Sequence, residues 1–302
     1  MKKSLFILLF LIFNGPLLAQ QETQFWLASY QLNNINPAMA GMHEGSELVI
    51  HSNSQWTAID DAPRTFAFSY ATQTNNKLGV GINFVTDKVY VERQTQAFLD
   101  FSYPLQISSE VFLQLGLKAG GNFYNAAVQN LRSTGQDFDP AQQSISTFKP
   151  NVGAGLYLNF KKYWFALSQP RLLNNNLDNS EWVQSQDRIH TYLGLGTSFN
   201  IRDGWMLKPT ILMQHVKGLP TIFSYQMAVN FQEKIDFGLS HRSTGELGFI
   251  TYIPISSQIK AGYAFAQPTQ GNLAGLQLRT HEILLKIRLD GNDRVAFEKE
   301  EQ

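Results

Sequence analysis

The sequence predicts an all-β protein: a transmembrane antiparallel β-barrel of about 14 strands, preceded by an N-terminal periplasmic or lumenal plug segment. Three observations lead to this prediction. Apolar residues alternate with small or polar residues along most of the chain, which is the period of a β-strand. Connections between these segments are short on one side and often long on the other. The chain begins like an exported protein yet has no cysteine, so no disulfide framework holds it.

Residues 1–19, MKKSLFILLFLIFNGPLLA, have the layout of a secretory signal peptide. Lys2 and Lys3 precede an apolar run, and Ala19 offers a small residue at the expected cleavage site. The run is too short for a stop-transfer helix. The remaining chain keeps 24 acidic residues and 22 of its 24 basic ones. Because this balance provides no basic face, no nucleic-acid partner is expected.

Strict alternation identifies the strands. In VFLQLGLKAGG, for example, Leu113, Leu115 and Leu117 alternate with Gln114 and Gly116. Such alternation indicates half-buried antiparallel strands rather than helices. The predicted strands span residues 46–52, 64–72, 77–86, 92–105, 109–124, 147–160, 162–170, 187–201, 204–214, 221–232, 235–243, 245–256, 258–266 and 279–289.

The connections favour a barrel in an outer membrane. Those after even-numbered strands are short, whereas several after odd-numbered strands are long: 53–63, 125–146, 171–186 and 267–278. Outer-membrane barrels have short periplasmic turns and longer external loops, and an even strand number places both termini on the periplasmic side. A soluble β-sandwich would explain the period, but its second face should be charged and solvated. Here that face is mainly Gly, Ser, Asn, Gln and Thr, as in a polar lumen.

The barrel hypothesis makes further predictions about side chains. The apolar face should contact outer-membrane lipid, so Arg at Leu115 or Leu156 should prevent assembly, whereas Ser at Gln114 or Gly116 should be tolerated. Strand glycines are interpreted as relief of crowding in a curved wall. Aromatic residues near strand ends are expected to form interfacial girdles. These are Tyr103, Tyr124, Tyr163, Trp164, Trp205 and Tyr252.

No local motif points to chemistry. The six histidines do not fall at metal-ligand spacings, and neither a GxSxG nor a Walker sequence occurs. We therefore predict no metal site, no cofactor and no catalytic residue. An enzyme site assembled from distant strands stays open as a minor alternative.

Two stretches are not explained by a barrel wall. The first is NNINPAMAGMH, residues 33–43, in which Asn36 and Pro37 favour a rigid turn while Ala38 and Gly41 permit close backbone approach. We interpret residues 20–45 as a plug that folds into the lumen or its mouth. A disordered leader is the alternative.

The second stretch is QWTAIDDAPRT, residues 55–65, in the first long external connection. Trp is a residue type often found at binding hot spots, but in a polar loop it is also commonly a packing anchor. Both interpretations remain open for Trp56. The predicted partner-binding residues are Trp56, Gln55, Asp60, Asp61, Pro63 and Arg64.

With these two stretches in view, the chain resembles the PorP/SprF family, outer-membrane components of type IX secretion and gliding systems. The family signature runs roughly NPA-x-x-G, then a strand, then QW followed by a proline and another strand. Here it reads Asn36-Pro37-Ala38 with Gly41, then Gln55-Trp56, then Ala62-Pro63-Arg64-Thr65. LGVGINFVTDKV and LQLGLKAGGNFY also look like family strands. One departure is that the last strand ends near Leu289 and a polar tail, residues 290–302, follows.

The resemblance implies a binding function in the cell outer membrane. Such proteins work with secreted adhesins or enzymes that carry a C-terminal secretion domain. We therefore expect a non-enzymatic receptor or anchor that binds this domain of a type IX cargo protein for export or surface attachment, alongside other type IX components. A channel for small solutes is the alternative. The expected organisation is a signal peptide (1–19), plug segment (20–45), barrel (46–289) and tail (290–302).

Overall fold

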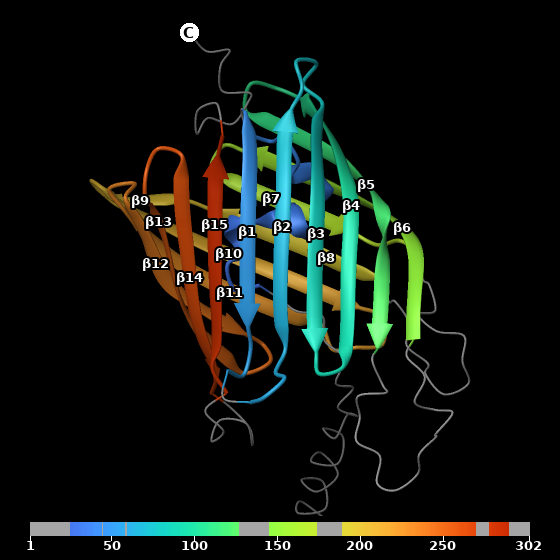
Figure 1. Ribbon diagram of the computed structural model, residues 1–302. Coiled ribbons are helices and arrows are strands. Elements are labelled where there is room, and N and C mark those ends of the chain that lie inside the picture. The colour runs from blue at the N-terminus through green and yellow to red at the C-terminus, as the bar shows by residue number, and fades with distance from the viewer. Residues whose placement is uncertain are drawn as a thin grey trace, which may run out of the picture.

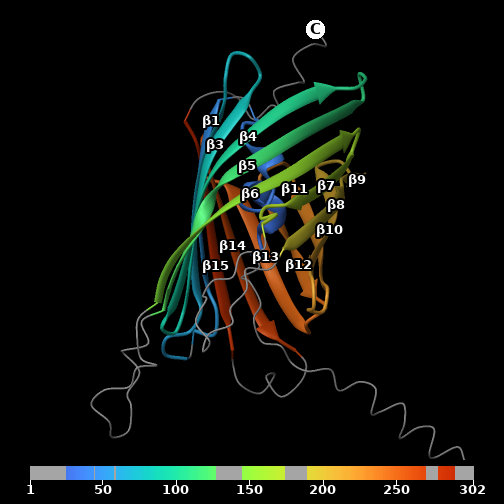
Figure 2. The same cartoon turned by 90° about the vertical axis from the view of Figure 1, so that its right-hand side faces the viewer.

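The computed structural model describes residues 25–43, 45–57, 59–126, 145–173, 189–269 and 278–289. Within these residues the chain forms one closed antiparallel barrel (Figures 1 and 2), and β1 pairs with β15 to close it. The strands are β1 (Ser46–Ser54), β2 (Arg64–Gln73), β3 (Gly79–Val89), β4 (Glu92–Gln106), β5 (Val111–Ala126), β6 (Ile145–Phe160), β7 (Tyr163–Gln169), β8 (His190–Thr197), β9 (Phe199–Arg202), β10 (Trp205–Val216), β11 (Ile222–Phe231), β12 (Ile235–Arg242), β13 (Glu246–Pro254), β14 (Ile259–Pro268) and β15 (Thr280–Arg288).

The predicted strand number is confirmed. β8 and β9 are separated only at Ser198, and both pair with β10, so together they form one strand position of the barrel. Fifteen strands with one such pair make fourteen positions. Each predicted segment coincides with one position, and the ends agree to within three residues. The local alternation of side chains was therefore sufficient to locate the whole wall.

The two faces of the wall also follow the predicted alternation. On β5, Leu115 and Leu117 are 43% and 65% exposed, whereas Gln114 and Lys118 on either side of them are 0% and 3% exposed. Leu115 lies opposite Leu156 of β6 in the register, and Gly116 lies opposite Gly155. Apolar side chains thus face outward, where a bilayer would cover them, and polar side chains face the lumen.

The aromatic girdle is only partly as predicted. Tyr103 and Tyr163 are outward and about half exposed, as a girdle requires. Tyr124, in contrast, is buried on the inward face of β5. Trp164 packs with lumenal residues, and Tyr252 stacks on Tyr30 of the N-terminal segment. The prediction was wrong for these three because closeness to a strand end does not decide which face a side chain occupies.

The two ends of the barrel differ. The first residue of β1 and the last of β15 lie together at the end that also carries the short β2–β3 turn, at the top of Figure 1. The amide of Leu289 donates to the carbonyl of Ser46 there (2.9 Å). The predicted signal peptide (1–19), the predicted tail (290–302) and most of the connections 125–146 and 171–186 lie outside the described residues. No helix among the described residues is long and apolar enough to cross a membrane.

Candidate functional site

The N-terminal segment, residues 25–43, lies inside the ring of strands (Figures 1 and 2). It forms three 3₁₀ turns: η1 (Ala28–Tyr30), η2 (Leu32–Asn34) and η3 (Pro37–Met39). Asn36 caps η3, because its Oδ1 accepts from the amide of Ala38 (3.0 Å) while Pro37 supplies the preset first residue. The Nδ2 of Asn36 donates to the carbonyl of Leu156 on β6 (2.9 Å), so the cap also joins the wall.

Glycines of the wall leave space for η3 and the residues after it, because they have no side chains. A Cβ on Gly116 would lie 2.1 Å from the amide nitrogen of Ala38, and one on Gly155 would lie 2.1 Å from Oδ1 of Asn36. On β3, a Cβ at Gly79 would lie 2.0 Å from the carbonyl oxygen of Ala40. Gly41 has φ +61°, which favours glycine, and a Cβ there would meet the Thr72 carbonyl.

These contacts correct the sequence-based interpretation of the strand glycines. The glycines do more than relieve crowding within a curved wall, because they create space for the N-terminal segment. The expectation that Ser would be tolerated at Gly116 is therefore wrong. Gln114 is likewise constrained, since its Nε2 donates to Ser102 (2.8 Å) and to the carbonyl of Ala40 (3.5 Å).

Wall side chains also satisfy carbonyl groups of the segment, which lack sheet partners. Ser168 donates to the carbonyl of Ile35 (2.8 Å), and Ser102 donates to that of Ala40 (2.5 Å). Lys118, which is buried, donates to the carbonyl of Asn34 (3.3 Å) and lies 3.5 Å from the carboxylate of Asp100. Buried carbonyls need such partners, so the polar lumen matches the segment's backbone.

The first residues of the segment are held by Glu282 of β15. This carboxylate, which is fully buried, accepts hydrogen bonds from the amides of Trp26 (2.8 Å) and Leu27 (2.7 Å). His51 Nε2 contacts the same carboxylate at 2.7 Å. The guanidinium of Arg242 lies 3.8 Å from the centre of the Trp26 ring, a cation–π contact. One buried anion therefore serves as the acceptor for the start of the segment.

Contacts of the middle of the segment reach other parts of the wall. Gln31 donates to Ser69 on β2 (3.0 Å), and Ser29 donates to Gln226 on β11 (3.0 Å). Burial raises the pKa of Tyr30 far above its usual range, and the nearby carboxylate of Asp236 raises it further. Tyr30 is therefore a neutral hydroxyl at any physiological pH. Residues 25–43 thus contact strands from β1 around to β15.

The connection between β1 and β2 carries the predicted partner-binding residues at the opposite end of the barrel. The amide of Gln55 donates to the carbonyl of Pro63 (3.0 Å), which closes the base of the loop. Trp56 is half-buried and has φ +50°, an uncommon conformation for a bulky residue. Asp60, Asp61 and Arg64 are exposed.

A neighbouring turn that the sequence analysis missed completes this surface. The amide of Tyr90, in the β3–β4 turn, donates to the carbonyl of Asp61 (3.2 Å), and Lys88 lies 3.6 Å from the Asp61 carboxylate. Ile59, Val89 and Tyr90 are 48%, 43% and 54% exposed. We call Ile59, Asp60, Asp61, Val89 and Tyr90 the loop patch. Its signal in the sequence was the apolar pair Val89-Tyr90 within DKVYVE, between two predicted strands.

In the described part of the chain, no three His, Cys, Asp or Glu residues come together as a possible metal site. His51 contacts Glu282, and the amide group of Gln214 contacts His190 Nδ1 (2.9 Å). These histidines take part in pairwise polar contacts within the lumen.

Comparison with known proteins agrees with this architecture. The family model for the type IX secretion system membrane protein PorP/SprF matches residues 17–287. The toluene transporter TodX of P. putida superimposes with a TM-score of 0.52 at 9% identity, over 85% of this chain and 93% of that chain. Omp33 of Acinetobacter baumannii gives a TM-score of 0.47 at 10% identity, over 82% and 99%. No curated relative matches. The chain is an outer-membrane β-barrel and belongs to the PorP/SprF family of type IX secretion system membrane proteins.

Proposed function

We propose that this protein is a non-enzymatic receptor or anchor in the outer membrane for a type IX cargo protein. It binds the cargo's C-terminal secretion domain at the long-loop end of the barrel, for export or for surface attachment, and works with other type IX components. The family membership supports a role in type IX secretion. We favour binding over conduction because of the contacts that the N-terminal segment makes inside the lumen.

The proposal rests mainly on how residues 25–43 are bound to the inner side of the wall. Their backbone amides and carbonyls hydrogen-bond to wall side chains on several strands, including Glu282, Lys118 and Ser168. A solute path would have to break these buried contacts, each of which is costly to leave unmade. We interpret the segment as a plug that fills the lumen, so that the useful surface is the mouth with its loops.

The loop patch supplies a surface suited to a protein partner. Exposed apolar side chains in water-facing loops, rimmed by carboxylates, are typical of interaction sites. Tyr90 and Trp56, which lies in the β1–β2 connection, are of the types that most often contribute binding energy. Ile59, Asp60 and Asp61 lie in the same loop as Trp56.

A passive or selective channel is the second candidate. TodX is described as a toluene transporter, but the likeness at 9% identity concerns the fold alone. A fourteen-stranded barrel is wide enough to enclose a solute path once nothing fills it. Conductance of the wild-type protein in planar bilayers separates the two functions: a receptor with a seated plug should be silent, whereas steady open currents would favour the channel.

The direct test is cargo capture in cells. A tagged barrel is cross-linked at the cell surface and purified, and the secreted proteins recovered with it are measured per folded barrel. Ile59→Ser with Tyr90→Ser should lower recovery of a specific secreted protein about tenfold or more. Ile107→Ser, which changes an exposed isoleucine at the short-turn end (61% exposed, against 48% for Ile59), is the control and should have no effect. Equal recovery in all three would remove the loop patch from the proposed function.

A further inference from the structure

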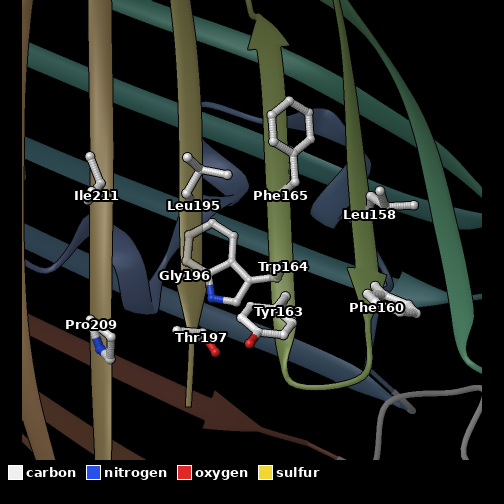
Figure 3. A pocket seen from close by; sticks show the side chains of 10 residues that line it. All are labelled: Leu158, Phe160, Tyr163, Trp164, Phe165, Leu195, Gly196, Thr197, Pro209 and Ile211. Atoms are coloured by element: carbon white, nitrogen blue, oxygen red, sulfur yellow. The ribbon is translucent and has the colours of Figure 1, made fainter. Parts of the chain in front are cut away.

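The outer face of the wall has an apolar hollow of about 410 Å³ over β6, β7, β8 and β10 (Figure 3). The end of the hollow farther from the β6–β7 turn is lined by Leu158, Phe165, Leu195 and Ile211. Tyr163 and Thr197 line the part next to that turn, so the hollow is apolar at one end and carries two hydroxyl groups at the other.

The floor of the hollow has no side chain at Gly196 of β8, which faces the lumen and lies opposite Trp164 of β7 in the register. Gly196 cannot carry one, since a Cβ there would lie 2.2 Å from Nε1 of Trp164. The indole of Trp164 reaches across from β7 beside Gly196, as Figure 3 shows. The outward-facing side chains of Leu195 and Ile211, which are 43% and 39% exposed, form walls of the hollow. The hollow therefore opens on the lipid-facing side of these strands.

The positively charged side chain of Lys162 lies beside the end of the hollow that carries the hydroxyl groups. Lys162 Nζ lies 4.5 Å from the ring centre of Phe199 and 5.5 Å from that of Tyr163, which lines the hollow. Lys162 is exposed, and no carboxylate pairs with it among the described residues. Its neighbour Lys161 differs, because it is paired with Glu110 at 3.0 Å. Lys162 is therefore available to an anion from outside the chain.

We propose that this hollow binds one glycerophospholipid of the leaflet at the short-turn end, a site independent of the cargo-binding function. One acyl chain fills the space between Leu195, Phe165 and Ile211. The phosphate pairs with Lys162, and the ester region lies beside Tyr163 at the same end of the hollow.

The site gains specificity from shape and charge rather than from hydrophobic transfer. An acyl chain in the bilayer is already in an apolar medium, so only close packing in the concave wall and the phosphate contact distinguish this lipid from its neighbours. Short turns of such barrels face the periplasm. The leaflet on that side therefore supplies the lipid, and the lysine lies at its headgroup level.

The test uses native mass spectrometry of the delipidated full-length barrel, into which dioleoylphosphatidylethanolamine is titrated. Wild type should retain one lipid at least fivefold more tightly than Lys162→Ser. Leu195→Trp, which fills the hollow, should abolish that tight binding. The matched controls are Lys234→Ser, in an exposed turn at the same end, and Leu117→Trp, on the outward face of β5; both should bind as wild type does.

Several outcomes would overturn the proposal. If Lys162→Ser and Lys234→Ser retain lipid alike, the lipid is bound around the barrel without preference. The same conclusion follows if Leu195→Trp matches Leu117→Trp. Dioleoylglycerol has the chains but no phosphate, so equal binding of this probe by wild type would refute the role of Lys162. Because Lys162 is in an exposed turn, its variant keeps the test decisive even if Leu195→Trp fails to assemble.

Discussion

The carboxylate of Glu282 accepts a 2.8 Å hydrogen bond from the backbone amide of Trp26, 256 residues earlier in the chain. The last strand of the barrel thus holds the beginning of the N-terminal segment that lies inside the ring of strands. The same carboxylate accepts from the amide of Leu27, and the pair of bonds fixes the direction in which the chain enters. Closing the barrel and seating the segment are therefore coupled, because β15 takes part in both.

Replacing Glu282 with Gln should loosen the segment while the barrel still forms. The amide keeps one acceptor oxygen but presents an NH₂ group to a backbone donor, and hydrogen bonds to a charged group contribute about 1.5–3 kcal/mol each. Protease cleavage within residues 25–43 of the detergent-purified barrel should become faster. Lys149→Gln, an inward-facing lysine on β6, controls for altered lumen charge. Equal cleavage in both variants would mean that Glu282 does not hold the segment.

Valine at Gly116 should prevent normal assembly, and deletion of residues 33–43 should rescue it. The clash is with the backbone of Ala38, which the deletion removes. Gly120→Val provides the matched control, because its Cβ would meet the carbonyl oxygen of Ala97 in the wall itself (2.1 Å) and should stay harmful in both backgrounds. Assembly is measured as heat-modifiable barrel in the outer membrane. The deletion alone should also raise conductance in planar bilayers, and a silent deleted barrel would argue against a plug.

Arginine at Leu115 tests the outward face. Leu115 projects into the lipid-facing band, and a charge near the midplane of the bilayer costs about 2–4 kcal/mol in such barrels. The fraction of heat-modifiable protein should fall strongly, while Leu115→Met should assemble as wild type does. Full assembly of the arginine variant would contradict the orientation of β5 in the membrane.

How far the sequence predicts the structure depends on whether a feature is local. The alternation of Leu115 and Leu117 with Gln114 and Gly116 is written in consecutive residues, so strands and faces could be located. The same parity places Tyr124 in the lumen, and the girdle assignment failed because it used position along the strand only. The cap formed by Asn36 and Pro37 was likewise foreseeable from local chemistry.

The contacts between the N-terminal segment and the wall were not predictable in this way. Gly79, Gly116 and Gly155 lie on three different strands, and only the closed barrel brings them around η3. Glu282 appeared simply as one polar residue of an alternating strand, since its partners Trp26 and Leu27 are more than 250 residues away. The link between Tyr90 and Asp61 also depends on two loops meeting at one end. Pairings at such separations leave no pattern in a single sequence.

Single cysteines should report which end faces outward. Cysteine at Asp60, in the exposed β1–β2 loop, should react with a membrane-impermeant maleimide on intact cells. Cysteine at Asn75, in the short β2–β3 turn, should react only after lysis. Cysteines at Ser133 and Asn175, in the predicted external connections 125–146 and 171–186, should also label from outside, although both positions lie outside the described residues. Labelling of Asn75 alone would invert the topology and place the loop patch in the periplasm.

The variant Trp56→Ala should show whether Trp56 binds the cargo or only packs against its own loop. Removing a large rigid anchor at an interface typically costs about 2 kcal/mol or more, which is roughly thirtyfold in affinity. If Trp56 inserts into the cargo, the cargo bound per folded barrel should fall by about that factor. The thermal stability of the barrel should remain close to that of wild type.

The competing interpretation is that Trp56 only holds its own loop, which its half-buried side chain and the closure between Gln55 and Pro63 would also allow. In that case Trp56→Ala lowers the yield of folded barrel, and cargo loss merely follows protein loss. Thr57→Ala, one residue further along the same loop and exposed, controls for nonspecific effects of substitution there. An unchanged ratio of cargo to folded barrel in Trp56→Ala would remove this residue from the binding site. The loop patch and the connections 125–146 and 171–186 would then be the surfaces to test.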